Sequence, residues 1–229
     1  MGIYIEALIL YILLFLPGGI PGTGASSREF SAAAECVKIL MCSLPSLVLV
    51  WYLILKPGGE AAAANGIPQA EITEKNIKSR LPVFGKKDVF SILITLPCLI
   101  LTGLLISFLS SLTGETQAGY LIYPPSSVPG WTALCISCFV SAYLEESYFR
   151  YYLLSKRESL KLSVPGVFAL SVILFSLCHS YAGFFGFLNA LISGAFLCFI
   201  FLKFNALHGI AVSHGLYNIL AFILNAIYK

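Results

Sequence analysis

The amino-acid sequence predicts an all-α fold, a polytopic bundle of about seven to eight transmembrane helices. The first observation is composition: 58% of the 229 residues are hydrophobic, only 11% are charged, and the mean hydropathy is +0.88. A soluble domain carries about a quarter charged residues. The second observation is that the apolar residues form runs of about 20, the length that crosses a ~30 Å hydrocarbon core as a helix.

Five apolar stretches are long enough to span a bilayer, at residues 36–55, 89–112, 131–154, 184–202 and 209–228. Two shorter stretches, 3–16 and 165–179, bring the expected spans to seven. The second short stretch opens on Pro165, which suits the first turn of a helix, and we expect it to continue to about residue 181. Pro45 and Pro97 lie inside spans and should kink them, which membrane helices tolerate.

The basic residues predict the orientation of the chain. They gather in the connector 56–88 and in the loops after residues 154 and 202, whereas the loop 113–130 has none: Lys75, Lys78, Arg80, Lys86, Lys87, Lys156, Arg157, Lys161 and Lys203. Such residues mark cytoplasmic loops. We therefore expect an integral membrane protein with its N-terminus in the cytoplasm. A bacterial or archaeal cytoplasmic membrane is the expected location.

The first short stretch has two interpretations. Residues 8–16 resemble the core of a signal peptide, and small residues at 22–25 offer a cleavage site. No Lys or Arg precedes this stretch, and Glu6 stands there instead, so we favour a retained first helix with Glu6 at the membrane interface. The whole chain, 1–229, then forms a single integral membrane domain.

Charge and cysteine content argue against two other classes of protein, nucleic-acid-binding proteins and disulfide-rich proteins. A net charge of +3 predicts no nucleic-acid partner. The seven cysteines are odd in number and lie mostly within apolar runs, so no disulfide framework is expected. Cys135 and Cys138 form a C-x-x-C pair with no second pair and no basic neighbour, and we assign them to packing rather than to redox or zinc chemistry.

Three short segments place ionisable or amide side chains inside otherwise apolar helices. A charge at the centre of a membrane helix costs about 2.5–3.5 kcal/mol on insertion scales, and such residues mark functional sites. The candidate residues are Glu145, Glu146, Arg150, Phe175, His179, His214 and Asn218. The small residues Ser193, Gly194 and Ala195 are predicted to let two helices approach closely.

Helical spacing divides the first segment. Glu146 and Arg150 are four residues apart, so they share a face and can form an ion pair. Glu145 is turned away by about 100° and is free to face another helix. A hairpin with its turn near residues 160–164 sets Glu145 and His179 at similar depth, a level that His214 can also reach.

Such a set suits the hydrolysis of a peptide bond. A carboxylate and an imidazole around one water act as a general base. A second imidazole and an amide donate hydrogen bonds to an oxyanion. The same atoms allow a second interpretation, in which Glu145, His179 and His214 bind a zinc ion with water as fourth ligand. The residues alone leave both open.

The ordered set E-E-x-x-x-R, F-x-x-x-H and H-x-x-x-N resembles the CAAX-protease and bacteriocin-processing (CPBP, abortive-infection) family of intramembrane proteases. This family includes the CAAX prenyl endopeptidase, and the resemblance covers about the last hundred residues. It implies that residues 131–229 form the catalytic core and that the substrate is a peptide or protein with a lipid or membrane anchor. Tyr151 stands where the family usually has glycine, and we expect it to alter helix packing beside the site.

The resemblance also implies a role for each candidate residue. Glu145 and His179 activate the water, and His214 and Asn218 hold the oxyanion. Three residues support them: Glu146 and Arg150 as an ion pair, and Phe175 as packing that orients His179. No cofactor is favoured, with zinc as the alternative. Two other functions stay open: a proton-coupled transporter, although no repeated half is found in the chain, and a non-catalytic immunity or scaffold protein of the membrane.

Overall fold

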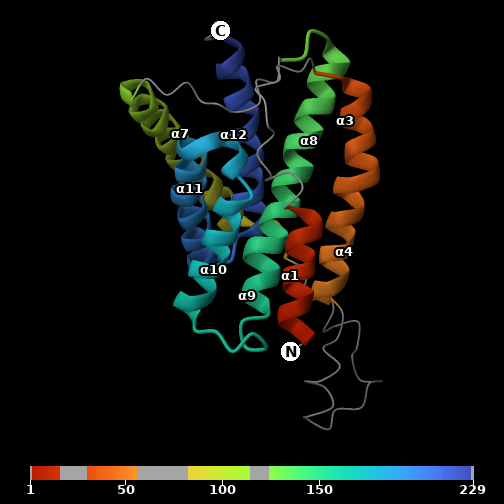
Figure 1. The fold of residues 1–229 in the computed structure, drawn as a ribbon, viewed down its shortest axis with the longest axis vertical. Coiled ribbons are helices and arrows are strands. Elements are labelled where there is room, and N and C mark those ends of the chain that lie inside the picture. Colours follow the sequence, from red (N-terminus) through yellow and green to blue (C-terminus); the bar gives the residue numbers. More distant parts are fainter. Residues whose placement is uncertain (1, 16–29, 56–81, 114–123, 228–229) are drawn as a thin grey trace.

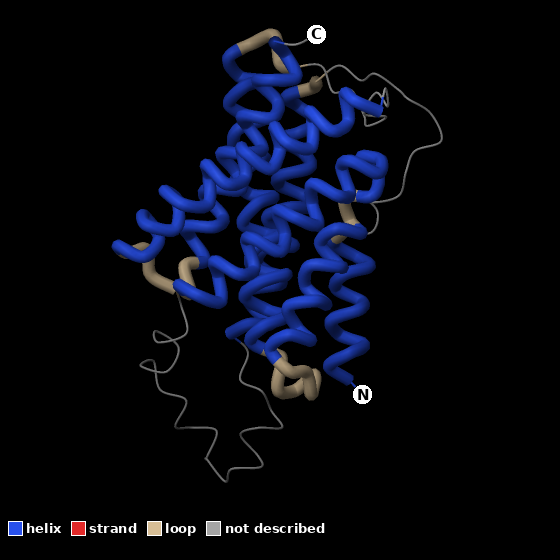
Figure 2. Tube along the Cα trace, turned by 90° about the vertical axis from the view of Figure 1, so that its left-hand side faces the viewer, coloured by secondary structure: helices blue, strands red, loops and turns tan. Residues whose placement is uncertain are grey.

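The computed structural model describes residues 2–15, 30–55, 82–113 and 124–227, without the side chains of residues 225–227. Helices are joined by short loops in these residues, which contain no strand (Figures 1 and 2). The all-α prediction is confirmed. The basic residues 75–80 and the small residues 22–25 lie outside the described residues.

The helices follow one another in a simple order. The N-terminal half of the chain contributes α1 (Gly2–Leu14), α3 (Ala32–Lys38), the π-helix η1 (Ile39–Ser43), α4 (Leu44–Leu55) and α7 (Lys86–Thr113). The C-terminal half contributes α8 (Val128–Glu146), the π-helix η3 (Ser147–Tyr152), α9 (Leu153–Ser155), α10 (Val164–Leu177), the 3-10 helix η4 (Ser180–Ala182), α11 (Gly183–Phe204) and α12 (Leu207–Ile227).

The five long predicted spans are confirmed as helices of sufficient length and apolarity. Five continuous helical segments are long and apolar enough to cross a membrane: Ala32–Leu55, Lys86–Thr113, Val128–Ser155, Ser180–Phe204 and Leu207–Leu224. Two shorter apolar helices, α1 and α10, match the two short stretches. By length and composition, the chain is therefore an integral membrane protein. Its orientation and the kind of organism stay predictions.

One boundary differs from the prediction. The helix that begins beside Pro165 ends at Leu177 and does not continue to residue 181. The chain has to reverse direction between α10 and α11, and Gly183 makes this possible with a φ of 76°, which side-chain-bearing residues rarely adopt. As a result, His179 lies just beyond the helix, in the turn before η4.

The predicted hairpin turn is present, at residues 156–163 between α9 and α10. Ser163 begins α10 because its hydroxyl accepts a hydrogen bond from the backbone N–H of Gly166 at 3.2 Å, as an N-cap does. Arg157 in this turn and Asn205 between α11 and α12 line one cavity. The turns of the two hairpins thus lie together at one end of the bundle, the lower end in Figure 1.

Two apolar clusters hold the bundle together. The first joins α1, α4, η3 and α10, and the second joins α7, α11 and α12. Tyr151 is packed against both clusters, with its ring 5.5 Å from that of Trp51 and 6.2 Å from that of Phe201. The residue that departs from the family pattern therefore fills space between helices.

Candidate active site

The site begins at a π-helix that the sequence does not reveal. Residues Ser147–Tyr152 form η3, a wider turn inserted between α8 and α9. Single π turns inside α-helices are frequent at functional sites. All but one of the six side chains of η3 are buried, and Tyr148, Phe149 and Arg150 have no exposed surface. Propensity offers no signal for this turn, because it depends on packing around the buried arginine.

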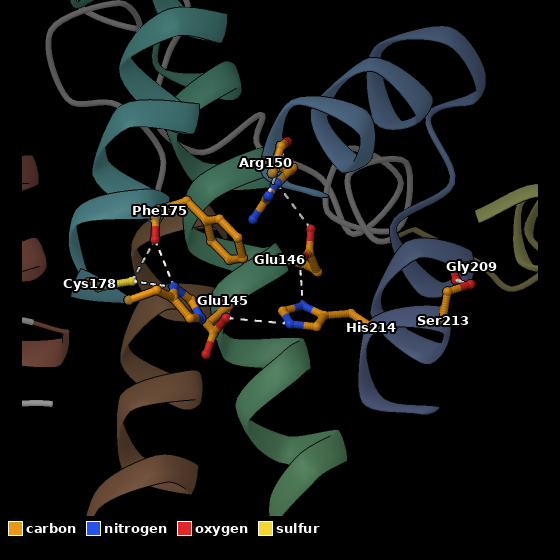
Figure 3. A network of polar contacts seen from close by, with 10 residues as sticks. Glu145, Glu146, Arg150, Phe175, Cys178, Gly209, Ser213 and His214 are labelled. Atoms are coloured by element: carbon orange, nitrogen blue, oxygen red, sulfur yellow. Dashed lines mark hydrogen bonds and ion pairs between the residues drawn. The ribbon is translucent and has the colours of Figure 1, made fainter. Parts of the chain in front are cut away.

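The predicted ion pair forms on this turn. Nε of Arg150 lies 3.2 Å from Oε2 of Glu146, and neither side chain has any exposed surface. The other carboxylate oxygen of Glu146 lies 2.9 Å from Nδ1 of His214, so the pair reaches α12 (Figure 3). Glu146 therefore orients the ring of His214 and also compensates the positive charge of Arg150. Residue spacing within one helix cannot reveal this second contact.

Glu145 is placed differently from its neighbour. Its Oε2 faces Nε2 of His214 at 3.8 Å, and 18% of its side chain is exposed. This distance is too long for a hydrogen bond, and no other described residue donates one to Oε2. Glu145 is thus directed toward the imidazole, with an oxygen whose hydrogen-bonding capacity is unused (Figure 3).

The second histidine is oriented by the main chain. Nδ1 of His179 lies 2.8 Å from the carbonyl oxygen of Phe175. Because a carbonyl only accepts hydrogen bonds, Nδ1 carries a proton, and in the neutral tautomer of this ring Nε2 is the acceptor. Phe175 therefore positions His179 in two ways, through its carbonyl oxygen and through a ring whose centroid is 4.7 Å from that of the imidazole.

The ring of Phe175 lies at the centre of the site. The centroid of the His214 ring is 5.8 Å from its centroid, in an edge-on arrangement. The guanidinium carbon of Arg150 is 4.2 Å from the same centroid, a cation–π geometry. His179 follows α10, His214 lies on α12 and Arg150 lies on η3, so one phenyl ring contacts three separate segments.

Helix α11 approaches this ring closely, and the absence of a side chain at Gly194 leaves room for the ring. A Cβ atom added at Gly194 would lie 2.7 Å from Cδ1 of Phe175 and 3.5 Å from Nη2 of Arg150. The carbonyl of Gly194 also accepts a hydrogen bond from Nη2 of Arg150 at 3.3 Å. The close helix approach predicted for residues 193–195 is confirmed at Gly194.

We expect Gly194→Ala to lower both the stability and any activity of the site, because the new methyl group displaces the ring of Phe175. Overpacking of this kind costs about 1–3 kcal/mol. Thermal unfolding of the purified protein measures the loss. Gly166→Ala is the matched control, because its Cβ would meet only Ser163 Oγ at 3.3 Å and more distant atoms of Leu162. Equal midpoints for the two variants contradict this account of Gly194.

The start of α12 is fixed by a buried carboxylate. Asp88, 1% exposed, accepts hydrogen bonds from the backbone N–H groups of Gly209 at 3.0 Å and Gly85 at 2.8 Å. These bonds tie the first turn of α12 to α7. Since His214 follows Gly209 on the same helix, Asp88 helps to set the position of the imidazole. Sequence analysis did not single out Asp88, because its partners lie far away in the chain.

Asn218 is the one predicted residue that does not join this network. It lies one turn beyond His214, is half-buried, and makes no hydrogen bond to another described residue. Its neighbour Tyr217 instead accepts a hydrogen bond from Nδ2 of Asn189 on α11 at 3.2 Å. Asn189 is an amide inside an apolar helix, a signal by which sequence analysis could have found it.

The zinc alternative requires three ligands to converge. Among the described residues, no group of three His, Cys, Asp or Glu side chains is arranged to hold a metal ion. Nδ1 of His179 and Nδ1 of His214 have protein partners, so Nε2 is the nitrogen that each ring could offer to a metal, and Oε2 of Glu145 lies 3.8 Å from Nε2 of His214. The zinc interpretation therefore stays a prediction.

Comparison with protein families gives one match. Residues 127–220 match the family described as Rce1-like, type II CAAX prenyl endopeptidase. This stretch runs from the start of α8 into α12 and includes Glu145, His179, His214 and Asn218. Comparisons with curated proteins and with solved structures found no match.

Proposed function

We propose that this protein is an intramembrane endopeptidase, because residues 127–220 match the Rce1-like family of type II CAAX prenyl endopeptidases. It hydrolyses a peptide bond in a lipidated or otherwise membrane-tethered peptide or protein. The observation that supports this most is the placement of Glu145, partly exposed and 3.8 Å from His214, in front of a fully buried Glu146–Arg150 pair. Residues 131–229 form the catalytic core.

In the proposed reaction, Glu145 removes a proton from a water molecule as the water oxygen attacks the carbonyl carbon of the substrate. His179 orients the same water by accepting its other hydrogen at Nε2, the nitrogen left free by the bond from Nδ1 to Phe175. The C–N bond then breaks, and the proton on Glu145 passes to the leaving nitrogen. No step uses a metal ion.

The oxyanion of the tetrahedral intermediate receives hydrogen bonds from Nε2 of His214 and from the amide of Asn218. His214 donates at Nε2 only when both ring nitrogens carry protons. In that form its charge, with that of Arg150, balances the two carboxylates of Glu145 and Glu146. The Glu146 carboxylate at Nδ1 keeps the ring in the orientation that this role needs.

The proposed substrate carries a membrane anchor because the site lies within the spans. Glu145 is ten residues from the end of α9, about 15 Å along a helix. Prenylated CAAX tails, leader peptides and sorting-signal remnants are the candidate substrates. A panel that varies the anchor and keeps the peptide constant separates them.

The experiment uses purified protein in vesicles and peptides with a prenyl group, an acyl group or no anchor. We expect hydrolysis of anchored peptides, detected as new termini by mass spectrometry, and a fall of about 10²–10⁴-fold for His179→Gln. His208→Gln is the control, because this histidine is held by the carbonyl of Pro82 at 2.9 Å and lies outside the network.

Equal rates for the two histidine variants contradict the role of His179. Absence of cleavage of every peptide, together with proton flux into the vesicles that depends on Glu145, supports the transporter instead.

A further inference from the structure

The N-terminal helix α1 lies outside the stretch that matches the family, yet its hydrogen bonds lead to both halves of the site. We propose that α1 is a brace for the active site and that Tyr11 is a positioning residue acting on His179. The proposal rests on the proposed function, because positioning is defined by the reaction that it serves.

The first contacts join α1 to η3, the turn that carries Arg150. The hydroxyl of Tyr152 donates to Oε1 of Glu6 at 2.7 Å, and the hydroxyl of Tyr148 donates to the carbonyl of Ala7 at 2.7 Å. Tyr148 and Tyr152 have no exposed surface. Glu6 thus has a partner on the π-helix, and its position at the membrane interface stays a prediction.

The second contact joins α1 to the end of α10. The hydroxyl of Tyr11 donates to the carbonyl of Leu174 at 3.1 Å, and the same carbonyl accepts the N–H of Cys178 at 3.3 Å. The Leu174 carbonyl therefore accepts two hydrogen bonds, one from the backbone of its own chain segment and one from α1. Tyr11 thus ties α1 to the last turn of α10.

The hydrogen bond from Tyr11 to Leu174 lies one residue away from the carbonyl that orients His179. The carbonyl of Phe175, next to that of Leu174, is the acceptor for Nδ1 of His179. Loss of the Tyr11 bond allows the last turn of α10 to shift, and the Phe175 carbonyl and its imidazole shift with it. Removing a hydroxyl more than 160 residues away in sequence thus changes the placement of the histidine proposed to orient the water.

The two contacts act together because they lie on one short helix. Ala7, Leu10 and Tyr11 form its buried face, whereas Leu8 and Leu13 are 56% and 65% exposed. Phe15, just after the helix, extends this face, with its ring centroid 4.7 Å from that of Phe149 on η3. Helix α1 therefore links the segment carrying Arg150 to the segment carrying Phe175, and limits their relative motion.

Tyr4 provides a matched control on the same helix. Its hydroxyl donates to the carbonyl of Leu160, which lies in the turn 156–163 at the lower end of the bundle and not at the site. Tyr4→Phe and Tyr11→Phe each remove one hydroxyl from α1 and one bond to a main-chain carbonyl. They differ in which carbonyl loses its donor.

The experiment compares the full-length wild-type protein, Tyr11→Phe and Tyr4→Phe in vesicles, by kinetics and by ¹⁵N NMR of the histidine rings. We expect Tyr11→Phe to lower kcat on the order of ten-fold with little change in KM, because displacement of a catalytic group by about 1 Å can cost 10²-fold. We also expect it to shift the His179 Nδ1 signal. Tyr4→Phe should change neither kcat nor the His179 signal. Its unfolding temperature should shift by about as much as that of Tyr11→Phe.

Equal kcat values and equal His179 signals for the two variants overturn the proposal and leave α1 with a purely structural role. If the wild-type protein cleaves no peptide, the proposed function fails, but the NMR comparison still decides whether Tyr11 positions His179. Glu6 gives a second test of the brace. Glu6→Gln keeps an acceptor for Tyr152 and should retain kcat, whereas Glu6→Leu removes the acceptor and should lower it.

Discussion

Glu145→Gln is expected to abolish peptide hydrolysis while leaving the fold intact. Loss of a general base costs about 10²–10⁴-fold in rate, and the glutamine keeps the size of the side chain. Stability should be unchanged or higher, since Oε2 of Glu145 accepts no hydrogen bond from the described residues and its charge lies inside the bundle. Initial rates with an anchored peptide and thermal unfolding measure the two effects.

Glu35→Gln is the matched control for this variant. Glu35 is also a carboxylate in an apolar helical segment, but it lies on α3, where it pairs with Lys38 at 2.8 Å and accepts a hydrogen bond from Ser137. We expect full activity from Glu35→Gln. A Glu145→Gln protein that cleaves as fast as this control rules out Glu145 as the base, and with it the proposed mechanism.

Arg150→Leu is expected to produce the largest loss of stability. It leaves the carboxylate of Glu146 without its ion-pair partner at a position with no exposed surface. Removing one member of a buried ion pair costs about 3–5 kcal/mol, because the remaining charge is uncompensated. The cation–π contact with Phe175 is lost as well. Thermal or denaturant unfolding in a fixed detergent measures the change in free energy.

Two further variants test the reason for this loss. The double variant Glu146→Gln with Arg150→Leu should be more stable than Arg150→Leu alone, since it leaves no buried charge. Arg157→Leu should cost at most about 1 kcal/mol, as is usual for exposed pairs, because Arg157 and its partner Glu158 are 42% and 85% exposed. A double variant no more stable than the single one indicates that Arg150 acts through packing rather than charge.

Much of the fold follows from the order of apolar and polar residues along the sequence. Hydropathy located the seven apolar helices found in the described residues, because burial in lipid requires an apolar surface along the whole length of a span. The boundaries at Pro165 and at the turn 156–163 followed from the proline and the polar residues there. Helical spacing alone paired Glu146 with Arg150, since residues four apart on a helix are neighbours whatever surrounds them.

Most of the predicted site residues lie close together in the structure, but one of them does not. Arg150, His179 and His214 lie around the ring of Phe175. Glu146 contacts Arg150 and His214, and Glu145 faces His214 at 3.8 Å. Asn218 does not contact the others in the described residues. Its catalytic role, like those of the rest, stays a proposal that the variants above test.

Spacing and hydropathy were therefore enough to find the helices, the local ion pair and the residues worth testing. They could not reveal the π turn at residues 147–152, the early end of α10, the bond from Glu146 to His214, or the hydroxyl groups by which α1 reaches the site. Each of these depends on contacts between segments far apart in the chain. Such contacts form only when whole helices pack, and packing selects partners that no local pattern encodes.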